Sequence, residues 1–278
     1  MKDKQASEKP EEKSLNEKEM PFLDHLEELR QRIIKSLLAV IVLSIVSYIF
    51  IDQIFELLVK PYRDAVHIAS SELAGTAAAD PTSRLVFLGP TGGFMVYLKL
   101  AVTMGLILSL PFVFYQVWRF IAPGLLKNER RYTPVVVLAT VFCFTAGAMF
   151  CYFVVLRFGL GFLLSFQSAS LVAMISIEEY FGFVTALIFI FGIVFEMPVL
   201  AFFLSRIGLL TPEFLRQYRR YSIVVIFIAA AVITPSVDAF TQILLAAPLL
   251  VLYEISIWVS KLAMPAAMRD SLREATAN

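Results

Sequence analysis

Hydrophobic residues along this chain are gathered into long runs that polar and charged stretches separate. Four of these runs are close to or above the ~20 residues that an α-helix needs to cross a bilayer core. Two more runs near the C-terminus are shorter. The pattern therefore predicts an all-α, polytopic integral membrane protein with six transmembrane helices. The runs are Ile33–Ile51, Leu100–Trp118, Tyr132–Leu156, Phe181–Leu204, Ser222–Ile233 and Phe240–Tyr253.

The last two predicted helices are short. Ser222–Ile233 stops at Thr234 and Pro235, and Phe240–Tyr253 stops at Glu254. As helices these runs would measure about 18 and 21 Å, less than the ~30 Å of the hydrocarbon core. We expect either a re-entrant hairpin or two helices that cross a locally thinned bilayer.

Four stretches lie outside this pattern. Residues 1–20 are rich in Lys and Glu, lack the apolar core of a cleavable signal peptide, and are expected to be a disordered polar segment. Residues 262–278 are expected to form a polar tail. The stretch 53–93 contains three prolines and predicts a long loop with helical turns but no separate domain. Phe158–Ile177 is predicted to be a helix extension followed by an interfacial loop.

The positions of Lys and Arg predict the orientation. With six spans, one side of the membrane carries most of them, including the groups at Lys127–Arg131 and Arg216–Arg220, and the other side carries few. Cytoplasmic loops are enriched in Lys and Arg. Both the N-terminus and the C-terminus are therefore expected in the cytoplasm.

Composition supports the membrane assignment and narrows the function. Of the 278 residues, 59% are hydrophobic and 17% are charged, and the mean hydropathy is +0.76. The net charge of +1 gives no reason to expect a nucleic-acid partner. Cys143 and Cys151 would be about 12 Å apart on a helix, too far for a disulfide, and are interpreted as small core residues.

Enzyme signatures are absent from the sequence. It contains no HExxH, GxSxG, P-loop or GxGxxG motif. The two histidines, His25 and His67, lie outside the predicted spans and on opposite sides of the membrane, so they cannot build one metal site. We expect no catalysis, no metal and no cofactor.

The stretch Phe22–Arg32, which reads FLDHLEELRQR, precedes the first span and predicts an amphipathic helix at the membrane surface. Glu28 and Arg32 are spaced for a favourable i,i+4 ion pair, whereas Asp24 and Glu28 place like charges at that spacing. The charged face is either a solvated helix face or a site for a cationic partner.

Glu129 lies in the loop sequence KNERR, among Lys127, Arg130 and Arg131. It either forms a local ion pair of small energetic value or converges with Glu28 on one ligand. Guanidinium groups bind carboxylates in a planar, two-pronged geometry that lysine lacks. Two spaced carboxylates would therefore suit a pair of arginines.

Glu196 is the one carboxylate well inside a predicted span, two residues before Pro198. An ionisable group at this depth is costly and usually faces a cavity or a partner. It is either a protonated acid bonded to a neighbouring helix or a polar contact for a translocating or docking segment. Asp238, on the predicted outer turn TPSVD, is ordinary for a turn.

Several of these motifs together resemble the TatC family, the six-span component of the twin-arginine protein translocase. The resemblance extends from about Met20 to about Lys261 and defines a membrane domain over residues 21–261. The motifs are FLDHLEELRQR, KPY (Lys60–Tyr62), FYQVWRFIAPGLLKNERR (Phe114–Arg131), FEMPV (Phe195–Val199) and TPSVDAFTQILLAAP (Thr234–Pro248).

The resemblance implies a receptor for the twin-arginine signal peptides of folded export substrates. It implies partners of the single-span TatA and TatB types, a homo-oligomer within the complex, and transport driven by the proton-motive force across a bacterial cytoplasmic (inner) membrane. It places an intramembrane glutamate at Glu196 and outer-loop residues at Pro61 and Asp238. The implied signal-binding residues are Glu28, Glu129, Leu29, Arg30, Arg32, Phe120, Pro123, Arg130 and Arg131.

One departure and one alternative accompany this resemblance. The outer turn TPSVD is one residue longer than the TPPD often found in the family, which bears on Asp238 alone. A secondary transporter of a small solute or ion is the alternative, because helices kinked at Pro111, Pro198 and Pro248 together with a glutamate at mid-membrane depth would suit it. No repeat relates the two halves of the sequence, which disfavours a transporter.

Overall fold

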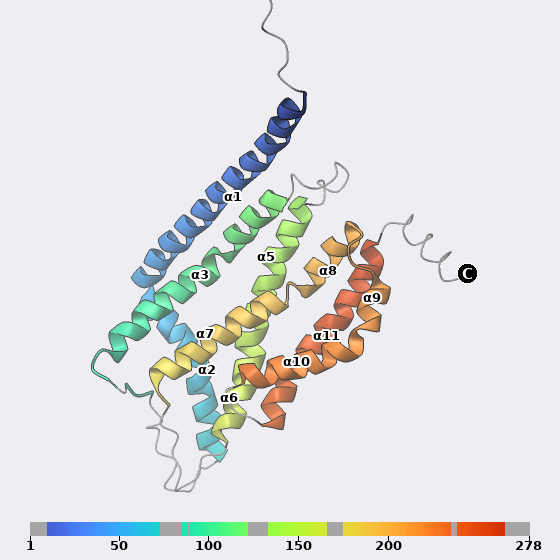
Figure 1. Ribbon diagram of the computed structural model, residues 1–278. Helices are drawn as coiled ribbons and strands as arrows, with labels where there is room; N and C mark the ends of the chain where they lie inside the picture. Colours follow the sequence, from blue (N-terminus) through green and yellow to red (C-terminus); the bar gives the residue numbers. More distant parts are fainter. Residues whose placement is uncertain are drawn as a thin grey trace, which may run out of the picture.

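The computed structural model describes residues 10–72, 85–87, 89–121, 133–165, 175–234 and 238–264. Throughout these ranges the regular elements are helices, which confirms the all-α prediction (Figure 1). The only bridge of the β type among them pairs Val86 with Ser176. The elements are α1 (Pro10–Ile49), α2 (Ile51–Glu72), α3 (Gly92–Ile121), α5 (Thr133–Phe150), the π-helical turn η2 (Cys151–Val155), α6 (Leu156–Leu164), α7 (Ile177–Val194), α8 (Met197–Arg206), α9 (Pro212–Gln217), α10 (Arg219–Ile233) and α11 (Ala239–Ala263).

Five segments of the described chain are long and apolar enough to cross a membrane. They match the first four predicted spans and the last one, whereas α10, with 15 residues, is shorter than the segments in this group. The predicted extension of the third span is confirmed, because η2 and α6 continue α5 to Leu164. The five segments are His25–Ile49, Gly92–Ile121, Thr133–Leu164, Ile177–Arg206 and Ala239–Ala263.

One prediction about helix length was wrong. The stretch predicted as a loop with helical turns contains α2, a helix of 22 residues with Pro61 inside it. α2 is amphipathic, and it buries Leu58, Val59 and Tyr62 against the core. α1 begins at Pro10, inside the segment expected to be disordered.

The prediction that both final helices are short was also wrong, since α11 has 25 residues. Glu254 does not end it, because the Arg219 side chain at the start of α10 lies 2.6 Å from the Glu254 carboxylate. The fourth predicted span is in turn two helices. α7 stops at Val194 and α8 starts at Met197, with Glu196 in the break and Pro198 at the start of α8.

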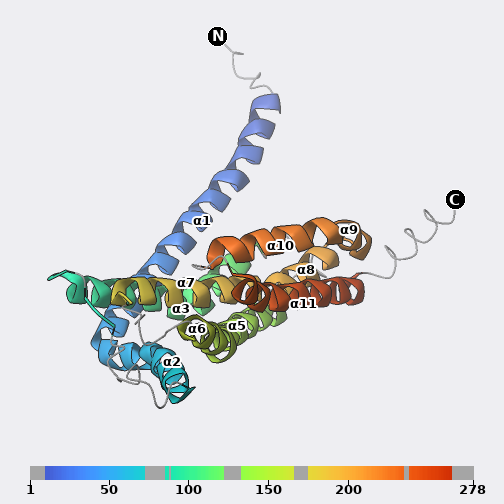
Figure 2. The same cartoon turned by 90° about the horizontal axis from the view of Figure 1, so that it is seen from below.

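α1 packs almost entirely along α3 and leaves the layer formed by the other helices (Figures 1 and 2). The two helices approach closely where α1 carries Ser44 and α3 carries Gly105. A Cβ atom added to Gly105 would lie 2.5 Å from the main-chain nitrogen of Ser44. Small residues at such crossings let membrane helices pack backbone to backbone.

The remaining helices share one core, which draws on α2, α3, α5, η2, α6, α7, α10 and α11. A hydrogen bond between buried hydroxyl groups connects α8 and α11. Ser205 of α8 and Ser260 of α11 are fully buried, and their Oγ atoms are 2.6 Å apart. Many large apolar side chains of α1 and α10 stay exposed, as expected for helices that face lipid or other membrane proteins.

Candidate functional site

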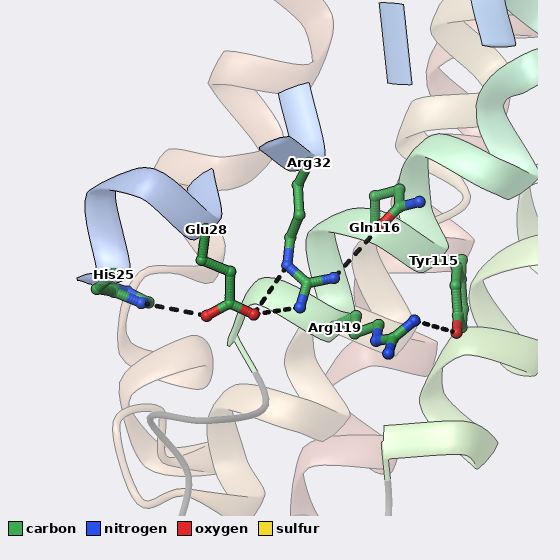
Figure 3. A network of polar contacts seen from close by, with 6 residues as sticks. All are labelled: His25, Glu28, Arg32, Tyr115, Gln116 and Arg119. Carbon is green, nitrogen blue, oxygen red and sulfur yellow. Dashed lines mark hydrogen bonds and ion pairs between the residues drawn. The ribbon is translucent and has the colours of Figure 1, made fainter. Parts of the chain in front are cut away.

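The stretch Phe22–Arg32 of the sequence analysis forms the turns of α1 before its apolar part, and its residues from His25 onward lie against the C-terminal half of α3 (Figure 3). The predicted pair is confirmed: Arg32 donates to Glu28 Oε1 through Nε at 3.1 Å and through a second, shorter contact from its terminal nitrogen. The Arg32 side chain is 14% exposed and that of Glu28 is 33% exposed. The arginine is therefore the more enclosed partner.

Arg32 also connects α1 to α3. Its third contact is a donated hydrogen bond of 3.3 Å to Oε1 of Gln116, which is 6% exposed. A buried amide that accepts from a guanidinium satisfies two groups that would otherwise be costly to bury. Gln116 thus fixes the position of Arg32, which in turn orients the Glu28 carboxylate.

His25 lies on the other side of the carboxylate. Its Nδ1 atom lies 3.8 Å from Glu28 Oε2, and its ring stacks on Phe120 of α3 with centroids 4.3 Å apart and an interplanar angle of 10°. Phe120 is one of the residues that the resemblance assigns to the site. The stacked pair is a second link between α1 and α3, one turn away from the link through Arg32.

The two oxygens of Glu28 consequently differ. Oε1 accepts both hydrogen bonds from Arg32, whereas the contacts among the described residues leave Oε2 with only the long contact to His25. Oε2 therefore has lone pairs free for a donor that arrives from outside. A guanidinium group fits this position because it donates in a fixed planar geometry.

Two further arginines lie on the helices that form the site. Arg30 pairs with Glu27 at 3.3 Å on the exposed side of α1. Arg119 donates to the Tyr115 hydroxyl at 3.2 Å along α3 (Figure 3). Each of these arginines has its own partner among the described residues, and neither forms an ion pair with Glu28.

The other predicted site residues divide into two groups. Leu29 is half-buried on α1, and Arg30 points to solvent. Four lie outside the described residues, so the convergence of Glu28 and Glu129 stays a prediction. These four are Pro123, Glu129, Arg130 and Arg131.

Glu196 occupies the break between α7 and α8 and is 5% exposed. Its Oε1 atom has no hydrogen-bond partner among the described residues. Thr140 of α5 and the main chain of Phe144 are its polar neighbours, and the Thr140 hydroxyl accepts a 3.1 Å bond from Trp118 Nε1. The role of Glu196 in docking or translocation stays a prediction.

The resemblance assigns two residues to outer loops; in the structure Pro61 lies within α2, and Asp238 directly precedes α11. Pro61 lacks an N–H, so α2 leaves the Leu57 carbonyl without its helical donor. The Tyr152 hydroxyl donates to that carbonyl at 2.8 Å. Asp238 caps the N-terminus of α11 through a 2.7 Å bond from Thr241 N to Oδ1.

Sequence reasoning missed two members of the site. Gln116 is a single amide in the apolar and aromatic run FYQVW, and such a residue marks a position with a polar partner. His25 was considered only as a metal ligand. The signal for its stacking was the aromatic residue Phe120 at the end of α3. In the described ranges no cluster of three His, Cys, Asp or Glu side chains is arranged to hold a metal ion.

Comparison with known proteins assigns the chain to a group of relatives with the same fold. Residues 24–248 match the model of the family described as Sec-independent protein translocase protein (TatC). The protein of that name from Desulforapulum autotrophicum is 39% identical over 244 residues, which cover 88% of this chain and 85% of that protein. The Aquifex aeolicus protein is 38% identical, with coverage of 88% and 96%.

A solved structure agrees with these relatives. The crystal structure of a twin arginine translocase receptor, TatC, superposes with a TM-score of 0.73 and 38% sequence identity. The superposition covers 86% of this chain and 99% of that one. The resemblance in the motifs is therefore confirmed over most of the sequence and most of the fold.

Proposed function

The chain belongs to the TatC family of Sec-independent protein translocase proteins, and from this we propose that it receives the twin-arginine signal peptides of folded export substrates at Glu28. It is a membrane-embedded component of a protein translocase and not an enzyme. The family assignment removes the need for the alternative of a secondary transporter.

The observation that carries the proposal is the asymmetry of the Glu28 carboxylate. Arg32 holds Oε1 in place, and Oε2 is left open at the surface. A signal-peptide arginine would donate to Oε2 without displacing Arg32, so the carboxylate is oriented before the ligand arrives. Preorientation of this kind lowers the ordering cost of binding. Glu129 is proposed to receive the second arginine.

The topology is proposed to follow the distribution of Lys and Arg. α10 then serves as a sixth, short span, and both termini lie in the cytoplasm of a bacterial cell, with the protein in the cytoplasmic membrane. Three exposed cations support this orientation. Arg119, Arg216 and Arg220 lie at the end of the helix bundle that carries the Glu28 site.

The partners are proposed to be single-span subunits of the TatA and TatB types and further copies of this chain. Large apolar side chains on α1 and α10 support lateral contacts, because Leu38, Ile45 and Val225 are each at least 59% exposed. Transport is proposed to draw on the proton-motive force, as the family resemblance implies.

The test is binding of a twin-arginine signal peptide to the purified full chain in detergent. The same peptide with both arginines replaced by lysine is the ligand control, and it should bind at least about tenfold more weakly, since lysine lacks the forked geometry. Glu28→Ala and Glu129→Ala should each weaken binding of the arginine peptide. Glu27→Ala, on the exposed side of the same helix, is the matched control. Binding that ignores both the arginines and Glu28 would overturn the proposal.

A further inference from the structure

A groove of about 400 Å³ lies between α3 and α7, at the end of the bundle opposite to the Glu28 site. Its walls are mainly apolar and include Val96, Val102 and Phe181. Lys99 and Glu178 are the charged side chains that the described residues contribute to it. The proposed signal-peptide site uses neither of these residues.

The main chain gives the relative levels of the two charged residues along the helices. The segments before α3 and α7 are joined by hydrogen bonds of 3.1 Å, from Val86 N to Ile175 O and from Ile177 N to Val86 O. The two helices therefore start at the same level. Glu178 is in the first turn of α7, and a Cβ atom added to Gly92, the first residue of α3, would lie 2.8 Å from its Oε1 atom.

Lys99 lies deeper than Glu178. It is seven residues beyond Gly92 on α3, which corresponds to about 10 Å of helix rise. It is exposed at the surface of the protein and forms no ion pair with any described residue. A lysine at this depth keeps its charge by extending its side chain toward the headgroup level. Along the membrane normal, the groove thus presents a cation with an anion farther out.

We propose that this groove binds one phospholipid whose headgroup carries a primary ammonium group, as in phosphatidylethanolamine. The lipid phosphate contacts Lys99, the ammonium contacts Glu178, and an acyl chain lies along Val96 and Phe181. The order of charges argues for this occupant, because the phosphate of such a lipid lies deeper than its ammonium. An anionic lipid without an ammonium would satisfy Lys99 but would leave Glu178 facing a negative headgroup.

The test is retention of defined lipids by the purified full chain, measured by native mass spectrometry. The lipids are phosphatidylethanolamine, phosphatidylglycerol and phosphatidylcholine with identical acyl chains. We expect phosphatidylethanolamine to bind about tenfold more tightly than the other two lipids, because only its ammonium group donates a charge-assisted hydrogen bond to Glu178. Lys99→Gln should weaken the binding of all three lipids, whereas Glu178→Gln should remove only the preference for phosphatidylethanolamine.

The controls change similar residues outside the groove. Lys60→Gln and Glu179→Gln alter exposed charges at the same end of the protein and should leave retention unchanged. Gly182 of α7 lines the groove, whereas Gly161 of α6 does not. A Cβ atom added to either glycine would have no other atom within 4 Å. Gly182→Leu should therefore fill the groove and release the lipid, whereas Gly161→Leu should not.

A photoreactive side chain at Leu98, which also lines the groove, identifies the occupant in native membranes. Crosslinks to phosphatidylethanolamine support the proposal, whereas crosslinks mainly to a protein overturn it. Equal retention of the lipid by Lys99→Gln, Glu178→Gln and their controls also overturns it. These outcomes do not depend on signal-peptide binding, so the proposed function is tested separately.

Discussion

The replacement Gly105→Ala tests whether the candidate site depends on how α1 rests on α3. The added Cβ atom would lie 2.5 Å from the main-chain nitrogen of Ser44, whereas heavy atoms in good contact are about 3.5 Å apart. The difference of about 1.0 Å must be taken up by moving α1, since a main-chain atom cannot rotate away. Such overpacking costs roughly 1–3 kcal/mol of stability.

The consequence reaches the site because α1 packs almost entirely on α3. Gly105 is about 16 Å along α3 from Gln116, and the Arg32–Gln116 bond is already 3.3 Å long. A displacement of about 1 Å breaks that bond, and a lost hydrogen bond of about 1 kcal/mol weakens signal-peptide binding about fivefold. Arg32 then no longer holds the Glu28 carboxylate in one orientation.

Two measurements check this reasoning on the purified chain. Spin labels at the exposed positions Leu37 of α1 and Leu108 of α3 should report a longer distance in Gly105→Ala, and peptide affinity should fall. Gly161→Ala is the matched control, because nothing lies within 4 Å of its added Cβ atom. If Gly105→Ala keeps both the label distance and the affinity of that control, the α1–α3 crossing does not support the site.

Three further predictions concern contacts between helices, each measured as the change in thermal unfolding of the purified protein. Tyr180→Phe removes a buried 2.7 Å bond to a main-chain carbonyl of α2 and should lower stability by about 1 kcal/mol. Ser205→Ala should cost more than the double replacement Ser205→Ala with Ser260→Ala, because the single variant leaves one buried hydroxyl without its partner; the opposite order would contradict this. Arg219→Gln should loosen α10 from α11 in low salt more than in high salt, since it removes the ion pair with Glu254, and equal effects at both salt concentrations would contradict the assignment.

The helices that the sequence predicted correctly are those whose signal is local. A run of about 20 apolar residues has few alternatives to a membrane helix, so α3 and the apolar part of α1 were predicted, although α3 begins at Gly92 and not at Leu100. α2 was missed because Pro61 and its polar residues resemble a loop. The amphipathic pattern of α2 indicates a helix only when the core that the helix covers is known.

The errors in the second half of the chain have a tertiary cause. Glu254 was taken as the end of the last helix, but Arg219 balances its charge from 35 positions earlier in the chain. The break at Glu196 was likewise not predicted, because the run from Phe181 to Leu204 is uniformly apolar around it. Partners that are distant in sequence decide where a membrane helix can tolerate a carboxylate.

The candidate site shows the same division between local and tertiary information. The Glu28–Arg32 pair follows from i,i+4 spacing and was predicted. The bond to Gln116 and the stacking of His25 on Phe120 require α1 to lie on the C-terminal half of α3, and no local pattern contains that pairing. The residues that orient the carboxylate are therefore the part of the site that the structure adds.

α3 also links the surface site to the buried glutamate. Gln116 and Trp118 are two positions apart on α3; the first accepts from Arg32, and the second donates to Thr140 of α5. Thr140 is a polar neighbour of Glu196 at the break between α7 and α8. The contact to Arg32 on α1 and the contact to Thr140 on α5 are therefore made from the same part of α3. Because unpaired polar groups are costly in an apolar medium, these contacts place the residues that orient Glu28 and the polar neighbours of Glu196 on one connected set of helices.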